Sequence, residues 1–223
     1  MVKALSFFKR KAGMPVDEFQ AYWRTQHPAA VTRLAGIRRY VQSHTLAAAY
    51  RKCEPVYDGI AEVWFDDTAA MHALRGTPAV AAVQVDEARF IDQATMGLII
   101  TEEHVLEDRA APAGAVKSVG FVRRRPGMTV EAFQRHWREI HAPLGLPVPG
   151  LRRYVQSHPR PSAYEKGRAP AWDGVASLWF DGVAELRAAT ASAEWARVSA
   201  DNGNLIAAGP IPSIVTTEHV IVA

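Results

Sequence analysis

The string RRYVQSH occurs twice, at residues 38–44 and 152–158, and this repetition constrains the fold more than any other feature of the chain. The copies are offset by 114 residues (152 − 38). After one inserted residue the offset becomes 115. These offsets align further identical pairs: Trp23 with Trp137, His27 with His141, Tyr50 with Tyr164, Asp86 with Asp201. Because the period is far longer than that of solenoid repeats, it indicates two copies of one domain.

The repeats are predicted to span residues 1–106 and 117–223. The segment between them, residues 107–116, is rich in alanine, glycine and charged residues and is predicted to be a linker.

Each repeat shows the same order of expected elements. In the first repeat these are a strand at 3–10, a helix at 16–34, strands at 38–44 and 58–65, helical segments at 68–75 and 78–87, and a strand at 99–106. Asp67 and, in the second repeat, Thr129 are predicted N-caps. The order β-α-β-β-α-β is that of the ferredoxin-like fold, which places the chain in the α+β class.

A four-stranded sheet with helices on one face leaves its other face uncovered. Two copies in one chain predict that the two uncovered faces meet. We therefore expect an α+β barrel in which the repeats pack sheet to sheet within one polypeptide, with a cavity between the sheets. Such a chain would be a monomeric pseudo-dimer or a homodimer of it.

The composition, with 48% hydrophobic and 22% charged residues, is typical of a soluble globular protein. The net charge of +3, with only short basic clusters, argues against nucleic acid as a partner. No apolar run approaches membrane-spanning length, so no membrane association is expected. The single cysteine, Cys53, fits a reducing compartment, and a cytoplasmic location is predicted.

Strand alternation gives the expected side-chain faces. It places Tyr40, Gln42 and His44 on one face of the second strand, and Glu62 and Trp64 on one face of the third. We expect both sets to face the barrel interior. Such a polar interior is either a ligand pocket or a hydrogen-bonded network that fixes the pairing of the two sheets.

His27 follows Phe19 and Trp23 on one helical stripe, which directs it toward the sheet. It is either a helix-capping histidine or a general acid or base. The copies differ at position 62, where Glu62 corresponds to Ser177. A carboxylate beside a histidine would favour the first repeat as the catalytic one.

The motifs GMPVDEFQAYWRTQHPA, RRYVQSH, YDGIAEVWFDD and EEHV, each with a counterpart in the second repeat, resemble the EthD-like family of the dimeric α+β barrel superfamily. The resemblance covers nearly the whole chain and implies a fused pair of EthD domains. The wider superfamily includes muconolactone isomerases, aromatic polyketide cyclases, cofactor-free quinol monooxygenases and haem-degrading enzymes. It therefore implies the fold more strongly than the reaction.

Together these observations predict a cofactor-independent enzyme of lyase or isomerase type, with no metal, acting on a hydrophobic aromatic or oxygenated small molecule. The expected catalytic residues are His27, His44, Tyr40 and Glu62. The expected substrate-binding residues come from both repeats: Trp23, Gln42, Asp58, Trp64, His141, Tyr154, Gln156, His158, Asp173 and Trp179. The alternatives are a noncatalytic ligand-binding or stress-related barrel and a haem- or quinol-linked monooxygenase.

Overall fold

The computed structural model describes residues 1–51 and 53–223. The chain divides into two compact units. The first comprises Met1–Thr101 together with Glu218–Ala223, and the second comprises Glu102–Thr217. The limits of the two sequence repeats, residues 1–106 and 117–223, stay a prediction.

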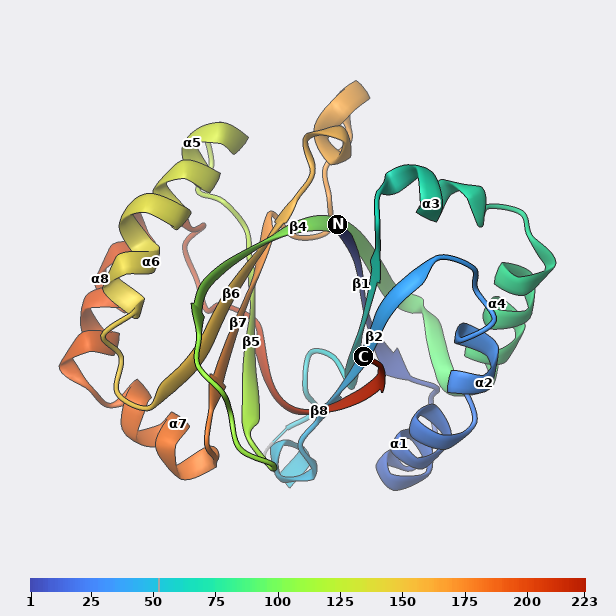
Figure 1. The fold of residues 1–223 in the computed structure, drawn as a ribbon. Coiled ribbons are helices and arrows are strands. Elements are labelled where there is room, and N and C mark those ends of the chain that lie inside the picture. The colour runs from blue at the N-terminus through green and yellow to red at the C-terminus, as the bar shows by residue number, and fades with distance from the viewer. Residues whose placement is uncertain (52) are drawn as a thin grey trace. The chain divides into compact units, whose positions relative to one another are not determined.

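The first repeat has the predicted β-α-β-β-α-β order, and each of its two helical regions is divided into two helices (Figure 1). Its elements are β1 (Val2–Arg10), α1 (Val16–Thr25), α2 (Pro28–Val31), β2 (Ile37–Thr45), the 3₁₀ turn η1 (Ala47–Arg51), β3 (Gly59–Phe65), α3 (Thr68–Ala73), α4 (Pro78–Phe90) and β4 (Ile91–Asp108).

The second repeat follows the same order. Its elements are β5 (Val116–Val122), α5 (Val130–His136), the π-helical turn η2 (Trp137–His141), α6 (Ala142–Gly145), β6 (Leu151–Pro159), the 3₁₀ segment η3 (Pro161–Gly167), β7 (Gly174–Phe180), α7 (Val183–Thr190), α8 (Ala193–Leu205) and β8 (Ser213–Val222).

The strands follow one closed hydrogen-bonded order, β1-β3-β2-β8-β5-β7-β6-β4. This confirms the predicted class: two ferredoxin-like α+β repeats with an eight-stranded barrel topology. The pairing of β2 with β3 in the first repeat has the same register as the pairing of β6 with β7 in the second. Val41 lies opposite Glu62 in the first repeat, and Val155 lies opposite Ser177 in the second.

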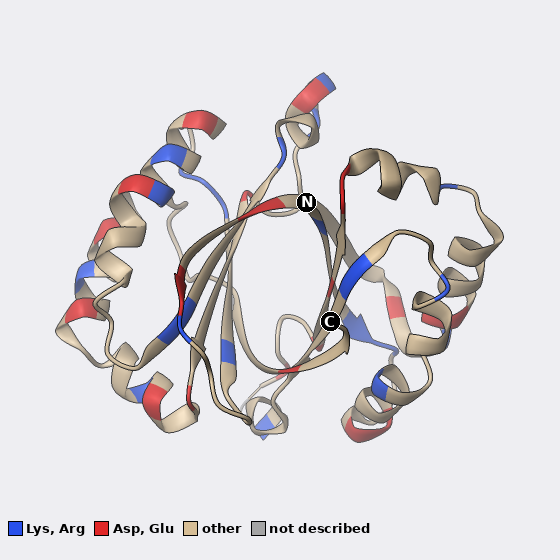
Figure 2. Ribbon diagram, viewed as in Figure 1, with Lys and Arg blue, Asp and Glu red and all other residues tan. Residues whose placement is uncertain are grey.

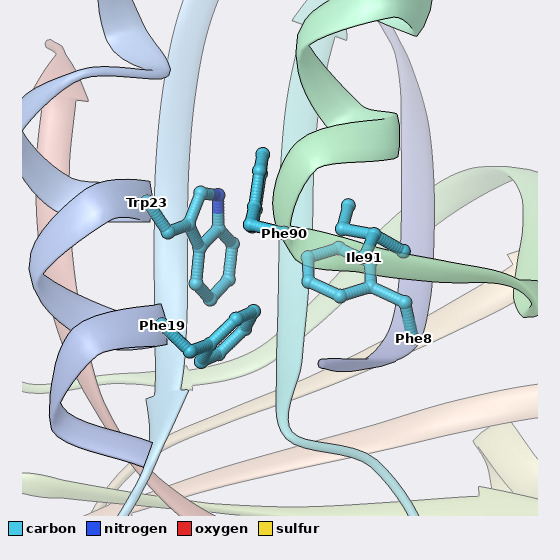
Figure 3. Packing of buried hydrophobic residues seen from close by; sticks show 5 residues of the cluster. All are labelled: Phe8, Phe19, Trp23, Phe90 and Ile91. Carbon is cyan, nitrogen blue, oxygen red and sulfur yellow. The ribbon is translucent and has the colours of Figure 1, made fainter. Parts of the chain in front are cut away.

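In each repeat the helices lie on one face of the sheet, where apolar side chains from sheet and helices form a core. In the first repeat, Phe8 and Ile91 from the strands pack against Phe19 and Trp23 of α1 and Phe90 of α4 (Figure 3). Val122, Phe133, Trp137, Leu205 and Ile206 form the corresponding cluster of the second repeat.

The helix predicted at 16–34 is wrong in its extent, because α1 ends at Thr25 and α2 begins at Pro28. Proline has no N–H to donate, and its ring clashes with the preceding turn, so the helix is interrupted before it. In the second repeat the chain instead widens into the π-helical turn Trp137–His141 just before Pro143. The histidine of each repeat lies at this irregularity.

Both predicted N-caps are confirmed. The side chain of Asp67 accepts a hydrogen bond from the Ala70 N–H, and Thr129 accepts one from the Ala132 N–H. The strand predicted at 99–106 is longer than expected, since β4 begins at Ile91 and continues to Asp108. It pairs with β1 from Ile91 onward, across an irregularity between Phe7 and Lys9.

Lysine and arginine are interspersed with aspartate and glutamate along the helices of each unit (Figure 2). This pattern is typical of a solvated surface rather than of a basic stripe for nucleic acid. None of the described helices has both the length and the apolar composition that a membrane span requires.

We predict that Gly59→Ala lowers the free energy of unfolding by about 1–3 kcal/mol, as overpacking of a core does. A Cβ at this position would lie 2.3 Å from Cζ3 of the buried Trp23 ring. Denaturant unfolding of the variant measures the effect. Gly203→Ala in α8 is the control, because its Cβ meets no atom within 4 Å. A Gly59→Ala variant as stable as the wild type would show that the ring can move aside.

Candidate functional site

Each repeat encloses a cavity between its helices and its sheet, and the two cavities occupy equivalent positions. The cavity of the first repeat has a volume of about 110 Å³, and that of the second has a volume of about 340 Å³. Both are lined by the repeated tryptophan, histidine and tyrosine: Trp23, His27 and Tyr40 in the first, and Trp137, His141 and Tyr154 in the second.

The predicted orientation of the second strand is wrong. Tyr40, Gln42 and His44 face the helices of their own repeat rather than the opposite face of the sheet. Tyr40 packs beside Val83 of α4, and Gln42 donates a hydrogen bond of 2.8 Å to the backbone carbonyl of Trp23. His44 stacks on the indole of Trp23, with ring centroids 4.3 Å apart. Tyr154, Gln156 and His158 are arranged in the same way around Trp137.

Glu62 lies on the other face of the sheet, so it does not meet the histidines as predicted. Residues that are opposite in paired strands share a face, and Glu62 is opposite Val41, the neighbour of Tyr40 and Gln42. Its carboxylate is buried and accepts hydrogen bonds from Lys3 Nζ at 2.9 Å and from Ser43 Oγ at 3.3 Å. Glu62 therefore gives no reason to favour the first repeat as the catalytic one, and that prediction is wrong.

The remaining predicted residues also lie outside the cavities. Asp58 accepts hydrogen bonds from Arg10 and from the hydroxyl of Tyr50, and thereby ties the start of β3 to the end of β1. Asp173 binds Arg124 and Tyr164 in the same way. Trp64 lies beneath Lys3 and Arg39, and Trp179 beneath Lys117 and Arg153, in cation–π contacts.

A hydrogen-bond chain in the second repeat fixes the direction of the Tyr154 hydroxyl. The amide nitrogen of Gln156 donates to the Trp137 carbonyl and to Tyr154 Oη, each at 2.9 Å. The Gln156 carbonyl oxygen therefore accepts from His158 Nε2, at 3.0 Å. Since the Tyr154 oxygen already accepts from Gln156, its own proton is available to an acceptor in the cavity.

A histidine–aspartate pair lies at the same cavity. Nδ1 of the buried His141 is 2.9 Å from Asp201 Oδ2. Asp201 also accepts from Asn204 Nδ2 at 2.8 Å and contacts His136 Nε2 at 3.1 Å. When Nδ1–H donates to a carboxylate, the neutral ring carries its lone pair on Nε2. Among the described residues, His141 Nε2 has no hydrogen-bond partner.

The electrostatics keep His141 neutral and Asp201 charged. Burial lowers the pKa of His141, and the opposing effect of Asp201 does not cancel it. Burial alone would raise the pKa of Asp201, but hydrogen bonds from Asn204, His141 and His136 outweigh it and lower that pKa. Burial raises the pKa of Tyr154 to about 12, against the hydrogen bonds from Gln156 and Trp137. The site therefore presents a neutral base and a protonated phenol near neutral pH.

The first repeat has the same pair with different surroundings. His27 Nδ1 is 2.7 Å from Asp86 Oδ2, and the Tyr22 hydroxyl donates to Asp86 Oδ1 at 2.6 Å. His27 therefore bonds a side chain of α4, not a last-turn carbonyl as a capping histidine would.

Small residues enlarge the second cavity. Gly120, Val122 and Gly145 line it where the first repeat has Ser6, Phe8 and Val31. The helix α8 adds two further differences: Trp195 joins the wall, and Asn202 stands where the first cavity has Glu87. The larger cavity is in the range of small-molecule sites, whose volumes begin near about 300 Å³.

Sequence reasoning missed Asp86 and Asp201 as partners of the histidines, and Glu87 and Asn202 as cavity residues. The recurrence of the aspartate at the repeat offset was the available signal. Among the residues that the structure describes, no group of three histidine, cysteine, aspartate or glutamate side chains is arranged to hold a metal ion.

The profile of the EthD domain matches the chain twice, at residues 11–94 and 125–209. The chain belongs to the EthD family. These two matches together cover more than half of the chain, one in each repeat, which confirms the predicted tandem arrangement. No match was found among curated proteins.

Solved structures share the fold at low sequence identity. An anthrone oxidase-like protein is 13% identical, with a TM-score of 0.66 over 99% of this chain and 93% of that one. A candidate monooxygenase from Lactobacillus acidophilus is 8% identical, with a TM-score of 0.58 over 98% and 94%. A variant chlorite dismutase from Candidatus Nitrospira defluvii is 9% identical, with a TM-score of 0.53 over 99% and 91%. At these identities the likeness is one of fold.

We predict that the protein loses stability as pH falls below about 6.5, through protonation of His44 and His158 in the unfolded chain. Burial lowers the pKa of each to about 3 in the folded state, with neighbouring histidine and arginine charges adding to the effect. Between these values the unfolded state binds more protons, so stability is complete above about 6.5 and falls toward about 3.

Urea unfolding across this pH range measures the effect. The double variant His44→Gln/His158→Gln should show a shallower loss than the wild type, whereas replacement of the exposed His72 by Gln should leave the slope unchanged. Equal slopes in the wild type and the double variant would contradict this assignment.

Proposed function

We propose that the protein is a small-molecule enzyme that transfers protons without a cofactor, and that the cavity of the second repeat is its active site. The observation that carries the proposal is the buried His141–Asp201 pair beside the Tyr154 hydroxyl in one cavity, with no partner for His141 Nε2 in the part of the chain that the structure describes. A base and a hydrogen-bond donor in one apolar cavity are what proton abstraction next to a carbonyl requires.

Asp201 would hold the ring so that His141 Nε2 is the base. Nε2 takes a proton from the carbon next to a carbonyl, and the electron pair moves toward the carbonyl oxygen. The Tyr154 O–H donates a hydrogen bond to that developing enolate oxygen. The imidazolium of His141 then returns the proton to another carbon of the enolate, which gives isomerisation, or gives it to a β-hydroxyl that leaves as water, which gives dehydration.

The wall of the cavity favours a hydrophobic, aromatic, oxygenated substrate. Trp137 and Trp195 supply flat apolar surface, and Asn202 supplies an amide that can donate and accept. The sequence-based assignment of His27 and Tyr40 as a base and a donor applies to the smaller cavity of the first repeat and stays a prediction. His44 is buried against Trp23 and would support the tyrosine through Gln42.

A second candidate is oxygenation of such a substrate, favoured by the names of the similar solved structures, which include a candidate monooxygenase and an anthrone oxidase-like protein. It shares the first step, because deprotonation of the substrate precedes attack on dioxygen in a cofactor-free reaction. Noncatalytic binding in the same cavity is the third.

We predict that the protein accelerates exchange of the α-protons of 1-tetralone, a bicyclic aromatic ketone, with deuterium from D₂O. His141→Ala should lower this rate about 10²–10⁴-fold, as loss of a general base does. Tyr154→Phe should lower it about 10²–10³-fold, as loss of an oxyanion donor does. Proton NMR follows the exchange, and His72→Ala is the matched control on the surface.

A folded His141→Ala variant that exchanges at the wild-type rate would refute the assignment of the base. Binding of 1-tetralone by the wild type without any accelerated exchange would favour the noncatalytic alternative. Consumption of dioxygen that depends on His141, with an oxidisable aromatic ketone such as anthrone, would favour the oxygenase.

A further inference from the structure

The cavity of the first repeat differs chemically from its counterpart at one position. Glu87 of α4 lines it, where the second cavity has Asn202. Among the described residues, the Glu87 carboxyl has no hydrogen-bond or ion-pair partner. It shares the cavity with His27 and the Tyr40 hydroxyl. Burying an unpaired carboxylate is costly, so such a group tends to take up a proton.

We propose that this cavity is a second proton-transfer site, in which His27 is the base and Glu87 is the acid, and that it takes an acyclic carbonyl compound smaller than a six-membered ring. The inference rests on the proposed function only for the class of reaction. It does not require the second cavity to be active.

An aspartate holds the base, His27, at its Nδ1 atom, as in the second repeat. Asp86 binds His27 Nδ1 at 2.7 Å and is itself fixed by the Tyr22 hydroxyl at 2.6 Å. Burial alone would raise the pKa of Asp86, but the hydrogen bonds from Tyr22 and His27 lower it, and Arg89 Nη1, at 3.6 Å, adds to them. His27 Nε2 has no partner among the described residues, and burial lowers the pKa of His27 despite Asp86. His27 therefore offers a lone pair at neutral pH.

The hydrogen-bond donor of the first cavity is the Tyr40 hydroxyl, which is oriented in the same way as that of Tyr154 in the second. Tyr40 Oη accepts from Gln42 Nε2 at 2.9 Å and from Trp23 Nε1 at 3.3 Å. Its own proton is then directed to an acceptor in the cavity. Tyr40 is fully buried, so bulk water does not reach its side chain.

The acid, Glu87, has no counterpart in the second cavity, where Asn202 takes its position. Burial, with a smaller contribution from the charge of Asp86, raises the pKa of Glu87 to about 7. The titratable groups around it are His27, Tyr40 and Asp86, and Arg89, two residues further along α4, lies 3.6 Å from Asp86. A carboxyl that is protonated near neutral pH can give up a proton, whereas the amide of Asn202 cannot.

A base and an acid together allow loss of water from a β-hydroxy ketone. His27 Nε2 takes the α-proton, the C–H electron pair forms the new C=C bond, and the C–O bond of the hydroxyl breaks. Glu87 gives its proton to the leaving hydroxyl, which departs as water, while Tyr40 stabilises the carbonyl oxygen. The His27 imidazolium then loses its proton and the Glu87 carboxylate regains one, so no electrons are transferred.

The size of the cavity limits the substrate. An apolar cavity of about 150 Å³ accommodates benzene, and the cavity of the first repeat is about 110 Å³. Val31, Phe8 and Ser6 fill the space that Gly145, Val122 and Gly120 leave open in the second repeat. A bicyclic ketone is therefore expected to enter only the second cavity.

The probe is 4-hydroxy-2-butanone, an acyclic β-hydroxy ketone, and its dehydration to 3-buten-2-one is followed by ultraviolet absorbance. All measurements use full-length protein carrying His141→Ala, which removes the base of the second cavity. In this background the reaction should persist, His27→Ala should lower its rate about 10²–10⁴-fold, and Glu87→Gln should lower it at least about 10-fold. Glu18→Gln on the exposed face of α1 is the matched control.

The pH profile separates an acid from a structural role. In the His141→Ala background the rate should fall as pH rises through about 7, and Glu87→Gln should abolish that fall. Rates that neither His27→Ala nor Glu87→Gln changes, or no dehydration at all in this background, would overturn the inference. Because 1-tetralone exchange reports on the second cavity, its loss in His141→Ala leaves the proposed function standing when the dehydration test fails.

Discussion

The buried indole of Trp23, and of Trp137 in the second repeat, is the interaction on which the rest of each repeat depends. The ring is admitted because Gly59 or Gly174 has no Cβ to meet it. Its flat face then stacks on His44 or His158, and its backbone carbonyl accepts from Gln42 or Gln156. The tyrosine of the same strand completes the contact. The repeated RRYVQSH therefore supplies three alternate side chains, Tyr, Gln and His, that all contact one tryptophan in each repeat.

Some residues of the cavity are the same in both repeats, whereas other residues of its wall differ. The histidine, the aspartate and the tyrosine are held by hydrogen bonds within each repeat. The volume and the remaining polar group depend on other wall residues, such as Val31 and Glu87 in one copy and Gly145 and Asn202 in the other. Duplication thus left the chemistry in place while the walls diverged, and the two cavities can accept molecules of different size and charge.

The fold could be predicted from the sequence because it follows from periodicity alone. Offsets of 114 and 115 gave the tandem organisation, and alternation and helical spacing gave the element order. Alternation did not tell which face of β2 meets the helices, because both faces carry polar residues. Only the register, with Gln42 opposite Ala61 and Val41 opposite Glu62, decides it. The polar residues of β2 were expected on the face away from the helices. Gln42 and His44 instead contact Trp23 on the face that the helices cover.

The cavity volumes could not be predicted, since each results from several substitutions on different elements. The extent of β4 was also underestimated, and its last residues, like those of β8, belong to the unit of the other repeat. This exchange bears on how the chain folds as it is made. The first unit needs residues 218–223, which leave the ribosome only after the whole second repeat. The nascent first repeat must therefore wait with a sheet edge unpaired, a state in which chaperone binding would protect it from aggregation.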